Sequence, residues 1–357
     1  MNILFIAKPL SKKGNGVVSA LKNELKYLQE SANVALFNIG VKLDKDICKI
    51  VYEVDKYQTI SSLPTPFNKP DLIVFEEVYK LEYIKLYNEC LKNKIPYIII
   101  PHGCLVEVEQ NNKKLKHMAA NILLFNRFIR KAEAIEFLNE QEQDNSKFKY
   151  KRSIIIPNAI DFVKRKYKKD KSAFKFIYVG RYDVKVKGLD LLIRTFINLK
   201  DWCIKNNVIL ELYGPKVESV ELNNLKEEIK KAKCQKIIKI NGPVYGDEKE
   251  QKLQEASVFI QTSRNEGQPM GIIEALSFSL PCVCTYATSF GKYCNEFECG
   301  IGVNFDEEEL KEAIMKMFND KEYLNKCEKN AKNKAKEDFE LKKVTEKTLK
   351  IYKEIIK

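Results

Sequence analysis

Residues 258–276 read Val-Phe-Ile-Gln-Thr-Ser-Arg-Asn-Glu-Gly-Gln-Pro-Met-Gly-Ile-Ile-Glu-Ala-Leu. The stretch begins with a short apolar run, which is typical of a buried strand. A polar loop follows, and Pro269 then suits the first position of a helix, because its missing N–H costs nothing there. The stretch therefore predicts a strand, a loop and a helix, which is the repeating unit of an α/β fold.

The same alternation of short apolar runs and longer helical patterns continues along the chain and predicts parallel sheets covered by helices. A first series of strands is expected at 2–7, 34–39, 72–75, 97–101, 134–138 and 153–156. A second series is expected at 174–180, 208–213, 236–240, 258–261 and 282–285. Helical spacing marks residues 17–29 and the chain from residue 306 onward.

These patterns predict an α/β fold with two domains in tandem, at 1–165 and 166–335. A C-terminal helix over 336–357 is expected to pack back on the first domain. The segment 164–172 is nearly all Lys, Arg and Asp, which suits a solvated linker. The length agrees, because 357 residues correspond to two domains of roughly 150 residues each.

Composition excludes several classes of protein. The chain is 45% hydrophobic and 31% charged, which is typical of a globular protein and excludes disorder. No apolar run approaches the roughly 18 residues that cross a bilayer. The N-terminus is interpreted as a strand and not as a signal peptide, so the ten cysteines are expected to be reduced and the protein cytoplasmic. Their spacing is not that of a metal site, and buried thiols are expected.

The positive charge is uneven. The formal net charge is +13, of which residues 1–170 carry +9 (29 basic and 20 acidic) and residues 171–357 carry +4 (33 and 29). The stretch 111–132 contains no acid and six cations, which are Lys113, Lys114, Lys116, Arg127, Arg130 and Lys131. Apolar residues lie between them. This mixture fits a basic amphipathic helix on an anionic bilayer, or a core helix with a solvated face. No nucleic-acid-binding signature accompanies the charge.

Candidate functional residues follow the predicted strands, because ligands of open α/β sheets bind beyond the carboxyl ends of the strands. Glu266 precedes the helix in 258–276, and Glu274 lies about two turns along it. A carboxylate can accept two hydrogen bonds from neighbouring sugar hydroxyls, and free amides at the helix start can hold a phosphate. The alternative is that both glutamates are solvated surface residues.

Cations and glycines follow other predicted strands. Arg181 comes directly after the strand at 174–180, and Lys187 follows six residues later, so the two could neutralise a diphosphate or be surface residues. In the first domain, Gly-Asn-Gly-Val at 14–17 opens a helix. It is not the dinucleotide fingerprint, so a nicotinamide or flavin has weak support. His102 ends a strand of consecutive isoleucines, where we expect a functional and not a structural role.

Together these motifs resemble the retaining glycosyltransferase family 4, whose GT-B fold has two Rossmann-like domains facing each other across a cleft. The likeness covers nearly the whole chain. Its strongest element is Glu-Gly-Gln-Pro at 266–269 with seven residues between Glu266 and Glu274. Its other elements are Val-Gly-Arg at 179–181 followed by Lys-Gly at 187–188, Ile-Pro-Asn-Ala-Ile-Asp at 156–161, Pro-His-Gly at 101–103 and the glycine loop at 14–16.

Two positions depart from the family pattern. The usual Gly-Gly after the strand at 282–285 is Ser289-Phe290-Gly291 here, and the usual Asn-Gly is Asn158-Ala159. The first departure concerns the loop that would contact the sugar or phosphate of the donor. The second is conservative as long as Ala159 need not adopt a positive φ.

The resemblance implies that the chain transfers a sugar, with retention, from a nucleotide-sugar donor to a glycan or lipid-linked glycan acceptor in cell-surface polysaccharide assembly. The donor is expected to be UDP-linked. No metal or other cofactor is expected, because cations and helix-start amides would stabilise the leaving diphosphate. The acceptor would be reached from the inner face of the plasma membrane, with 111–132 on an anionic surface. No nucleic-acid partner is expected.

The resemblance also implies roles for individual residues. Arg181 and Lys187 would bind the diphosphate, Glu274 would bind the ribose, and Glu266 would lie beside the donor sugar. His102 would reach a hydroxyl of that sugar from the acceptor domain. The catalytic set is His102, Arg181, Lys187 and Glu266; the other donor-binding residues are Gly16, Gly267, Gln268, Pro269, Met270, Gly271 and Glu274, and the acceptor side adds Gly14 and Asn15.

Other functions remain open at this point. A nucleotide-sugar epimerase of the same fold would need acid and base carboxylates facing the sugar, and a glycan phosphorylase would need a lysine for pyridoxal phosphate. The chain could also be a nucleotide-sugar-binding protein without catalysis, or a nucleic-acid binder driven by its charge. Hydrolysis of nucleotide sugars distinguishes a transferase from a binder.

Overall fold

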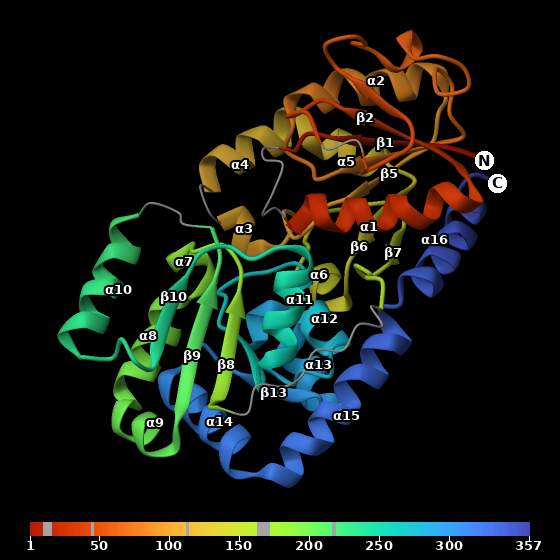
Figure 1. Cartoon of the computed structure of the whole chain (residues 1–357). Helices are drawn as coiled ribbons and strands as arrows, with labels where there is room; N and C mark the ends of the chain where they lie inside the picture. The colour runs from red at the N-terminus through yellow and green to blue at the C-terminus, as the bar shows by residue number, and fades with distance from the viewer. Residues whose placement is uncertain (10–15, 44–45, 112–113, 163–171, 216–218) are drawn as a thin grey trace. The chain divides into compact units, whose positions relative to one another are not determined.

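The computed structural model of the chain (Figure 1) describes residues 1–9, 16–43, 46–111, 114–162 and 172–215, and then 219–357. It divides into two compact units. The first unit is Met1–Asp161 together with Phe339–Lys357, and the second is Phe162–Asp338. Apart from Ser172, the expected linker at 164–172 lies outside the described residues.

In the first unit the described residues form a seven-stranded parallel sheet of order β3-β2-β1-β4-β5-β6-β7. Its strands are β1 (Asn2–Ala7), β2 (Asn33–Asn38), β3 (Val51–Glu53), β4 (Leu72–Glu76), β5 (Tyr97–Ile100), β6 (Ala134–Phe137) and β7 (Ser153–Ile155). The strand order reverses between β1 and β4, which are neighbours in space. Such a switch point is where open α/β sheets bind ligands.

Helices cover both faces of this sheet. On one face, α1 (Gly16–Ser31) lies beside the C-terminal helix α16 (Leu341–Ile355), as Figure 1 shows. On the other face are α2 (Leu81–Asn93) and α5 (Asn126–Lys131). The shorter elements are η1 (Ile60–Ser62), α3 (Glu107–Asn111), α4 (Lys114–Ala120), the π-helical turn η2 (Asn121–Phe125) and α6 (Glu140–Asp144).

The C-terminal helix is part of the core of the first unit. Leu349 and Tyr352 of α16 are buried in the same cluster as Leu21 and Leu25 of α1. The backbone of Ile160 exchanges two hydrogen bonds of 3.0 Å with the segment that leads into α16, donating to the carbonyl of Phe339 and accepting from the amide of Leu341. The motif at 156–161 thus anchors the last helix of the chain.

In the second unit the described residues form a six-stranded parallel sheet of order β10-β9-β8-β11-β12-β13, which reverses between β8 and β11. Its strands are β8 (Phe174–Val179), β9 (Val208–Tyr213), β10 (Ile238–Asn241), β11 (Val258–Gln261), β12 (Cys282–Thr285) and β13 (Gly300–Val303). Its helices are α7 (Val184–Lys187), α8 (Leu189–Asn198), α9 (Lys200–Asn206), α10 (Val220–Lys231), α11 (Gly246–Glu255), α12 (Met270–Ser277), η3 (Tyr286–Thr288), α13 (Phe290–Glu296), α14 (Glu307–Asn319) and α15 (Lys321–Asp338).

All ten cysteines are free, and nine of them are buried. Cys284 of β12 and Cys294 of α13 bring their sulfur atoms to 3.8 Å. Within the described ranges, no group of His, Cys, Asp and Glu side chains has an arrangement that could hold a metal ion. None of the helices seen there combines the length and the apolar character that crossing a membrane requires.

The burial of Tyr352 in the first unit predicts that α16 stabilises that unit and not the second one. Tyr352→Ala should destabilise that unit by about 3 to 5 kcal/mol, because it removes a fully buried ring from a packed core. The chain has one tryptophan, Trp202 in α9, so its fluorescence follows unfolding of the second unit. In urea, the circular-dichroism transition of the first unit should move to lower concentration while the Trp202 transition stays in place.

Lys350→Ala is the matched control, since Lys350 is exposed on the same helix. Equal shifts of both transitions in Tyr352→Ala would contradict the assignment of α16 to the first unit.

Candidate functional site

The second unit places two predicted residues together at its switch point. Lys187 ends α7 in the segment after β8, and Glu266 lies in the loop after β11, the neighbouring strand. The Lys187 ammonium forms an ion pair with Glu266 Oε1, and the two side chains are only 14% and 15% exposed. The sheet topology thus joins a cation and a carboxylate that are 79 residues apart in sequence.

Two side chains that the sequence analysis did not select hold Glu266 in place. Ser263 Oγ donates to Glu266 Oε1 over 2.9 Å, and Gln261 Nε2 donates to the same oxygen over 3.1 Å. Both residues are buried. A polar residue at the end of an apolar strand, such as Gln261, is the signal that could have found them.

The backbone contact beside Lys187 requires a glycine. Gly188 has a φ of +62°, and a Cβ atom there would lie 1.9 Å from the carbonyl oxygen of Thr262. Thr262 Oγ1 in turn donates to the carbonyl of Gly188 over 2.9 Å. The segments after β8 and β11 are therefore in direct backbone contact, and any side chain at position 188 would separate them.

Arg181 is placed differently from Lys187. It is exposed just after β8, and it makes none of the ion pairs found among the described residues. Tyr178 Oη donates to its backbone carbonyl over 2.8 Å, so the backbone is held while the side chain faces solvent. Arg181 is thus available to an anionic ligand, whereas Lys187 already has a partner.

The predicted helix after Glu266 is α12, with Pro269 as its N-cap residue and not its first helical residue. As a proline, Pro269 provides no side-chain cap to the first turn. Gly271 lets this turn approach the sheet, since a Cβ there would lie 3.2 Å from Phe259 and 3.4 Å from the carbonyl of Val179. The half-buried residues Gly267 and Gln268 form the loop before it, and Met270 is buried.

Glu274 lies on α12, where Lys249 of α11 donates to its Oε1 over 2.7 Å. The structure therefore gives the two motif glutamates separate cationic partners. Lys249 was not predicted, because a lysine in the middle of a polar helix carries no distinguishing signal.

The loop after β12 completes this group of loops. Ser289 has a φ of +64°, in the left-handed region that glycine adopts most easily. The family pattern has glycine in this segment, whereas this chain has a serine in the left-handed conformation. Its hydroxyl donates to the carbonyl of Gly267 over 3.0 Å. The side chain of Ser289 thus ties this loop to the loop that carries Glu266.

A second ion pair fixes the same loops from outside. Arg264 donates to both carboxylate oxygens of Asp190, over 2.9 and 2.7 Å, and to the carbonyl of Lys185 over 2.8 Å. Its guanidinium lies over the ring of Phe305, 4.0 Å from the centroid. Such a two-point pair is geometrically specific, and it links the loop after β11 to α7 and α8.

In the first unit, His102 lies just after β5, with a φ of +50°. Its Nε2 atom is 2.5 Å from Oε2 of Glu76, the last residue of β4. The side chain of Glu76 is buried, and that of His102 is 9% exposed. Glu76 was not among the predicted site residues, because it stands at the end of a strand whose other residues are apolar.

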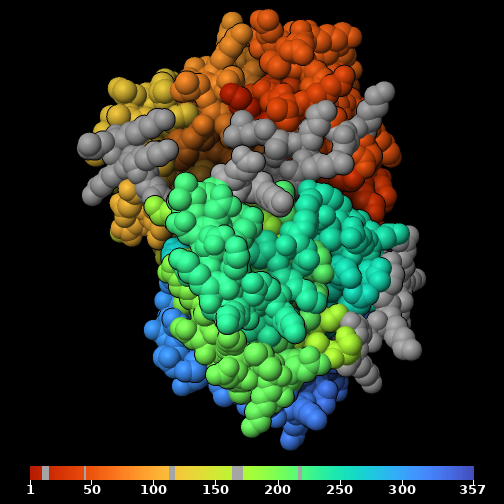
Figure 2. Space-filling view, turned by 60° about the vertical axis from the view of Figure 1, so that its left-hand side comes forward, coloured from red at the N-terminus to blue at the C-terminus, as the bar shows by residue number. Residues whose placement is uncertain are grey.

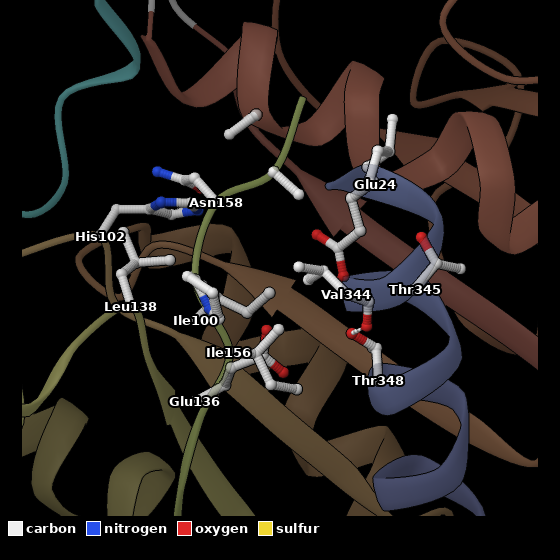
Figure 3. Close-up of a pocket in the computed structure, with 14 residues that line it drawn as sticks. Glu24, Ile100, His102, Glu136, Leu138, Ile156, Asn158, Val344, Thr345 and Thr348 are labelled. Carbon is white, nitrogen blue, oxygen red and sulfur yellow. Dashed lines mark hydrogen bonds between the residues drawn. The ribbon is translucent and has the colours of Figure 1, made fainter. Parts of the chain in front are cut away.

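A small cavity lies beside His102 (Figure 3). Its volume is about 30 Å³, room for about two water molecules. Figure 3 shows Glu24, Thr345 and Thr348 on the side of α16, His102 and Asn158 on the opposite side, and Glu136 at the lower edge beside Ile156. The cavity therefore joins one predicted site residue to α1, β6 and α16.

Of the predicted residues in the glycine loop, the structure describes Gly16, the first residue of α1. Gly16 is exposed, and a Cβ atom there would meet nothing within 4 Å. Gly14 and Asn15 lie outside the described residues, and so do the side chains of Lys113, Lys114 and Lys116.

Comparisons with known proteins bear on the fold and on the family that the chain resembles. Residues 159–334 match a protein family described as "Glycosyl transferases group 1". A comparison with curated protein sequences gave no significant match.

Solved structures resemble the chain over its full length. They include Alr3699/HepE of Anabaena in complex with UDP-glucose, with 14% identity, a TM-score of 0.78 and coverage of 99% of this chain and 100% of that chain. Sucrose-phosphate synthase of Thermosynechococcus elongatus has 15% identity, a TM-score of 0.75 and coverage of 99% and 98%. WaaG, described as a glycosyltransferase involved in lipopolysaccharide biosynthesis, has 14% identity and a TM-score of 0.71. The match covers 98% of this chain and 99% of that chain. The predicted GT-B fold, with two Rossmann-like units and a helical C-terminus, is confirmed.

The acids beside the cavity predict that the first unit loses stability as the pH rises. Burial raises the pKa of Glu136 to about 8, although the hydrogen bond from Tyr352 opposes the shift, and burial also raises the pKa of Glu24. An acid with a raised pKa binds its proton more tightly in the folded state. The stabilisation is therefore complete below the ordinary value of about 4.3 and is lost as the pH rises to about 8.

Glu136→Gln removes this titration and keeps an oxygen that accepts from Tyr352. The Tm of the first unit should therefore fall less between pH 5 and pH 8 in Glu136→Gln than in the unmodified protein. Glu133→Gln, which changes a surface ion pair with Lys151, should keep the original pH dependence. A Glu136→Gln curve parallel to the original would show that Glu136 does not titrate in this range.

Proposed function

We propose that the chain is a retaining, metal-independent glycosyltransferase that takes a sugar from a nucleotide-sugar donor, with UDP as the nucleotide. The observation that carries this proposal is the pairing of Lys187 with Glu266 at the switch point of the second unit, beside the start of α12, where Pro269 is the N-cap residue. The family match over 159–334 supports it. So does the likeness to structures solved with UDP or UDP-glucose.

In this proposal the second unit holds the donor. Arg181 and Lys187 bind the diphosphate, and the free amides of Met270 and Gly271 at the start of α12 face a phosphate or the sugar. Glu274 accepts hydrogen bonds from the ribose hydroxyls. Since Glu266 already binds Lys187, a donor that engages the ammonium group leaves a carboxylate oxygen of Glu266 for a sugar hydroxyl.

The proposed reaction is a front-face substitution. The bond between the anomeric carbon and the donor phosphate oxygen breaks, and a bond to the acceptor hydroxyl oxygen forms on the same face. The acceptor proton moves to the departing phosphate oxygen. Arg181 and Lys187 stabilise the charge that develops on the diphosphate, the task that a metal ion performs in other enzymes. His102 contributes a polar contact to a sugar hydroxyl.

We also propose that the acceptor is a lipid-linked glycan in cell-surface polysaccharide assembly, and that the first unit binds it at a membrane surface. The α4–α5 segment, residues 114–131, has two different sides. Phe125, Phe128 and Ile129 are buried in the core, whereas Ile122 and Leu123 are 68% and 77% exposed. Figure 2 shows this segment, in yellow, at the surface.

Cations accompany the exposed apolar residues. Arg127, Arg130 and Lys131 are exposed in α5, directly after Ile122 and Leu123. Exposed apolar side chains next to cations favour binding to a bilayer with anionic headgroups. The segment thus has features of both a core helix and a membrane-binding helix, with one side in the core and one side suited to a membrane.

The donor proposal predicts specific binding of UDP. Lys187→Met and Arg181→Met should each weaken UDP binding about 10- to 100-fold in calorimetry, because each removes a charged hydrogen bond to phosphate. Lys185→Met is the matched control, since Lys185 is exposed in the same short helix. Equal affinity in all three variants would place the diphosphate elsewhere.

A panel of nucleotide sugars then separates a transferase from a binder. Slow release of one nucleotide diphosphate from its sugar marks a transferase. Binding of UDP without any hydrolysis would favour the non-catalytic alternative.

The membrane proposal predicts flotation with anionic vesicles. The protein should float with phosphatidylcholine vesicles that contain 30% phosphatidylserine and not with phosphatidylcholine alone. Arg127→Gln with Arg130→Gln should weaken this binding about 30-fold, at about 1 kcal/mol for each charge. Lys85→Gln with Lys92→Gln on α2 is the matched control, because it removes the same charge from another surface of the unit. Equal flotation with both kinds of vesicle would refute the proposal.

A further inference from the structure

Glu76 and His102 form a buried pair whose carboxylate is fixed by the sheet. Glu76 is 1% exposed and ends β4, which lies between β1 and β5. In the ladder it pairs with Ile100, two residues before His102. Tyr83 Oη donates to the carbonyl of Glu76 over 2.7 Å. The position of this carboxylate is therefore set by the strand and by a buried tyrosine.

The backbone that carries His102 is fixed from the other side by Glu142 of α6. Glu142 Oε1 accepts from the amide of Gly103 over 2.5 Å, and Oε2 accepts from the amide of Leu138 over 2.8 Å. Both ends of the Glu76–His102 contact are thus held by buried hydrogen bonds. The imidazole ring has little freedom to turn.

This arrangement decides which ring atom is left for a ligand. Nε2 contacts Glu76, so Nδ1 is the only other polar atom of the ring. The ring lines the cavity of Figure 3, across from Glu24. A hydrogen bond between the ring and a ligand would therefore involve Nδ1, because Nε2 is already engaged with Glu76.

The groups around the ring favour its charged form. Burial is the largest single influence and lowers the pKa of His102, but the charge and hydrogen bond of Glu76 together with the charges of Glu142 and Glu77 outweigh it, so the pKa is raised. Glu136, Glu24 and the phenol of Tyr352 are the other titratable groups beside the cavity. Glu76 Oε1 is buried without a hydrogen-bond partner. The positive charge of the imidazolium is therefore the main interaction that offsets the cost of burying the Glu76 carboxylate.

We propose that Glu76 is a positioning residue for His102: it holds the ring through Nε2 and so presents a protonated Nδ1 to the substrate. The catalytic meaning of this arrangement rests on the proposed function, in which Nδ1–H donates to an oxygen of the reacting sugar. The arrangement of the ring itself does not depend on that function.

The chain has only two histidines, which makes the pairing directly measurable. Imidazole resonances followed by NMR between pH 5 and 9 give a pKa for each ring, and His117, stacked on Tyr79 at 5.2 Å, is the internal reference. In Glu76→Gln the pKa of His102 should fall by about 1 to 3 pH units, because the charged partner is lost while burial remains. His117 should not change. Glu133→Gln should leave both rings unchanged.

Kinetics test the positioning role. With His102 required in its protonated form, kcat falls as the pH rises through the pKa of His102. Glu76→Gln should move this alkaline limb to lower pH by the amount that NMR gives. A purely structural role would lower kcat by the same factor at every pH. Glu76→Asp keeps the charge and should restore a raised pKa of His102, and circular dichroism checks that both variants fold.

Each outcome decides the inference. An unchanged titration of His102 in Glu76→Gln, or nitrogen shifts that show Nδ1 as the bonded atom, would overturn it. A shifted titration with an unshifted kcat profile would overturn the positioning role. If the unmodified protein neither transfers nor hydrolyses any donor, the proposed function fails, and the NMR titration still decides whether Glu76 orients His102.

Discussion

The candidate site of the second unit depends on the backbone contact between Gly188 and Thr262. Parallel strands bring the segments after β8 and β11 to the same edge of the sheet, but only a residue without a side chain lets the two backbones touch. With that contact in place, Lys187 and Glu266 become neighbours in a region from which water is largely excluded. Arg264 with Asp190, and Ser289 with Gly267, then hold the loops at this spacing. The close approach of the charged groups Lys187 and Glu266 thus follows from the close packing of the two backbone segments.

The two units use their charged residues in different ways. In the second unit each motif glutamate is paired with a lysine, so among the cations discussed Arg181 is left to supply the excess positive charge. In the first unit, buried carboxylates surround one imidazole, and their charges must be compensated by protons and by hydrogen bonds. A ligand of the second unit, as proposed, would therefore compete with existing ion pairs. A ligand of the first unit would meet buried groups whose protonation depends on their neighbours.

Much of the fold could be predicted from the sequence, since apolar runs of four to seven residues between helical patterns mark strands clearly. Every strand predicted in this way overlaps a strand of the structure, whereas β3 and β13 were missed because they are short and, in β13, interrupted by glycine. Glu266 and Lys187 could be found from motifs that follow predicted strands. Lys249 and Gln261 could not, because their roles arise from which elements are neighbours in space. The sequence does mark Glu76, because two consecutive acids stand at the carboxyl end of an apolar strand. Its role could not be predicted, because its contact with His102 forms only when β4 and β5 become neighbours in the folded sheet.

The return of α16 to the first sheet has a consequence for biosynthesis. A ribosome makes the chain from its N-terminus, and domains tend to fold as they emerge. Here the second unit, which ends at Asp338, is fully synthesised before Tyr352 becomes available to the first. The part of the protein made first is therefore completed last. Until then α1 lacks its neighbouring helix, and the nascent chain exposes an apolar surface that a chaperone can recognise.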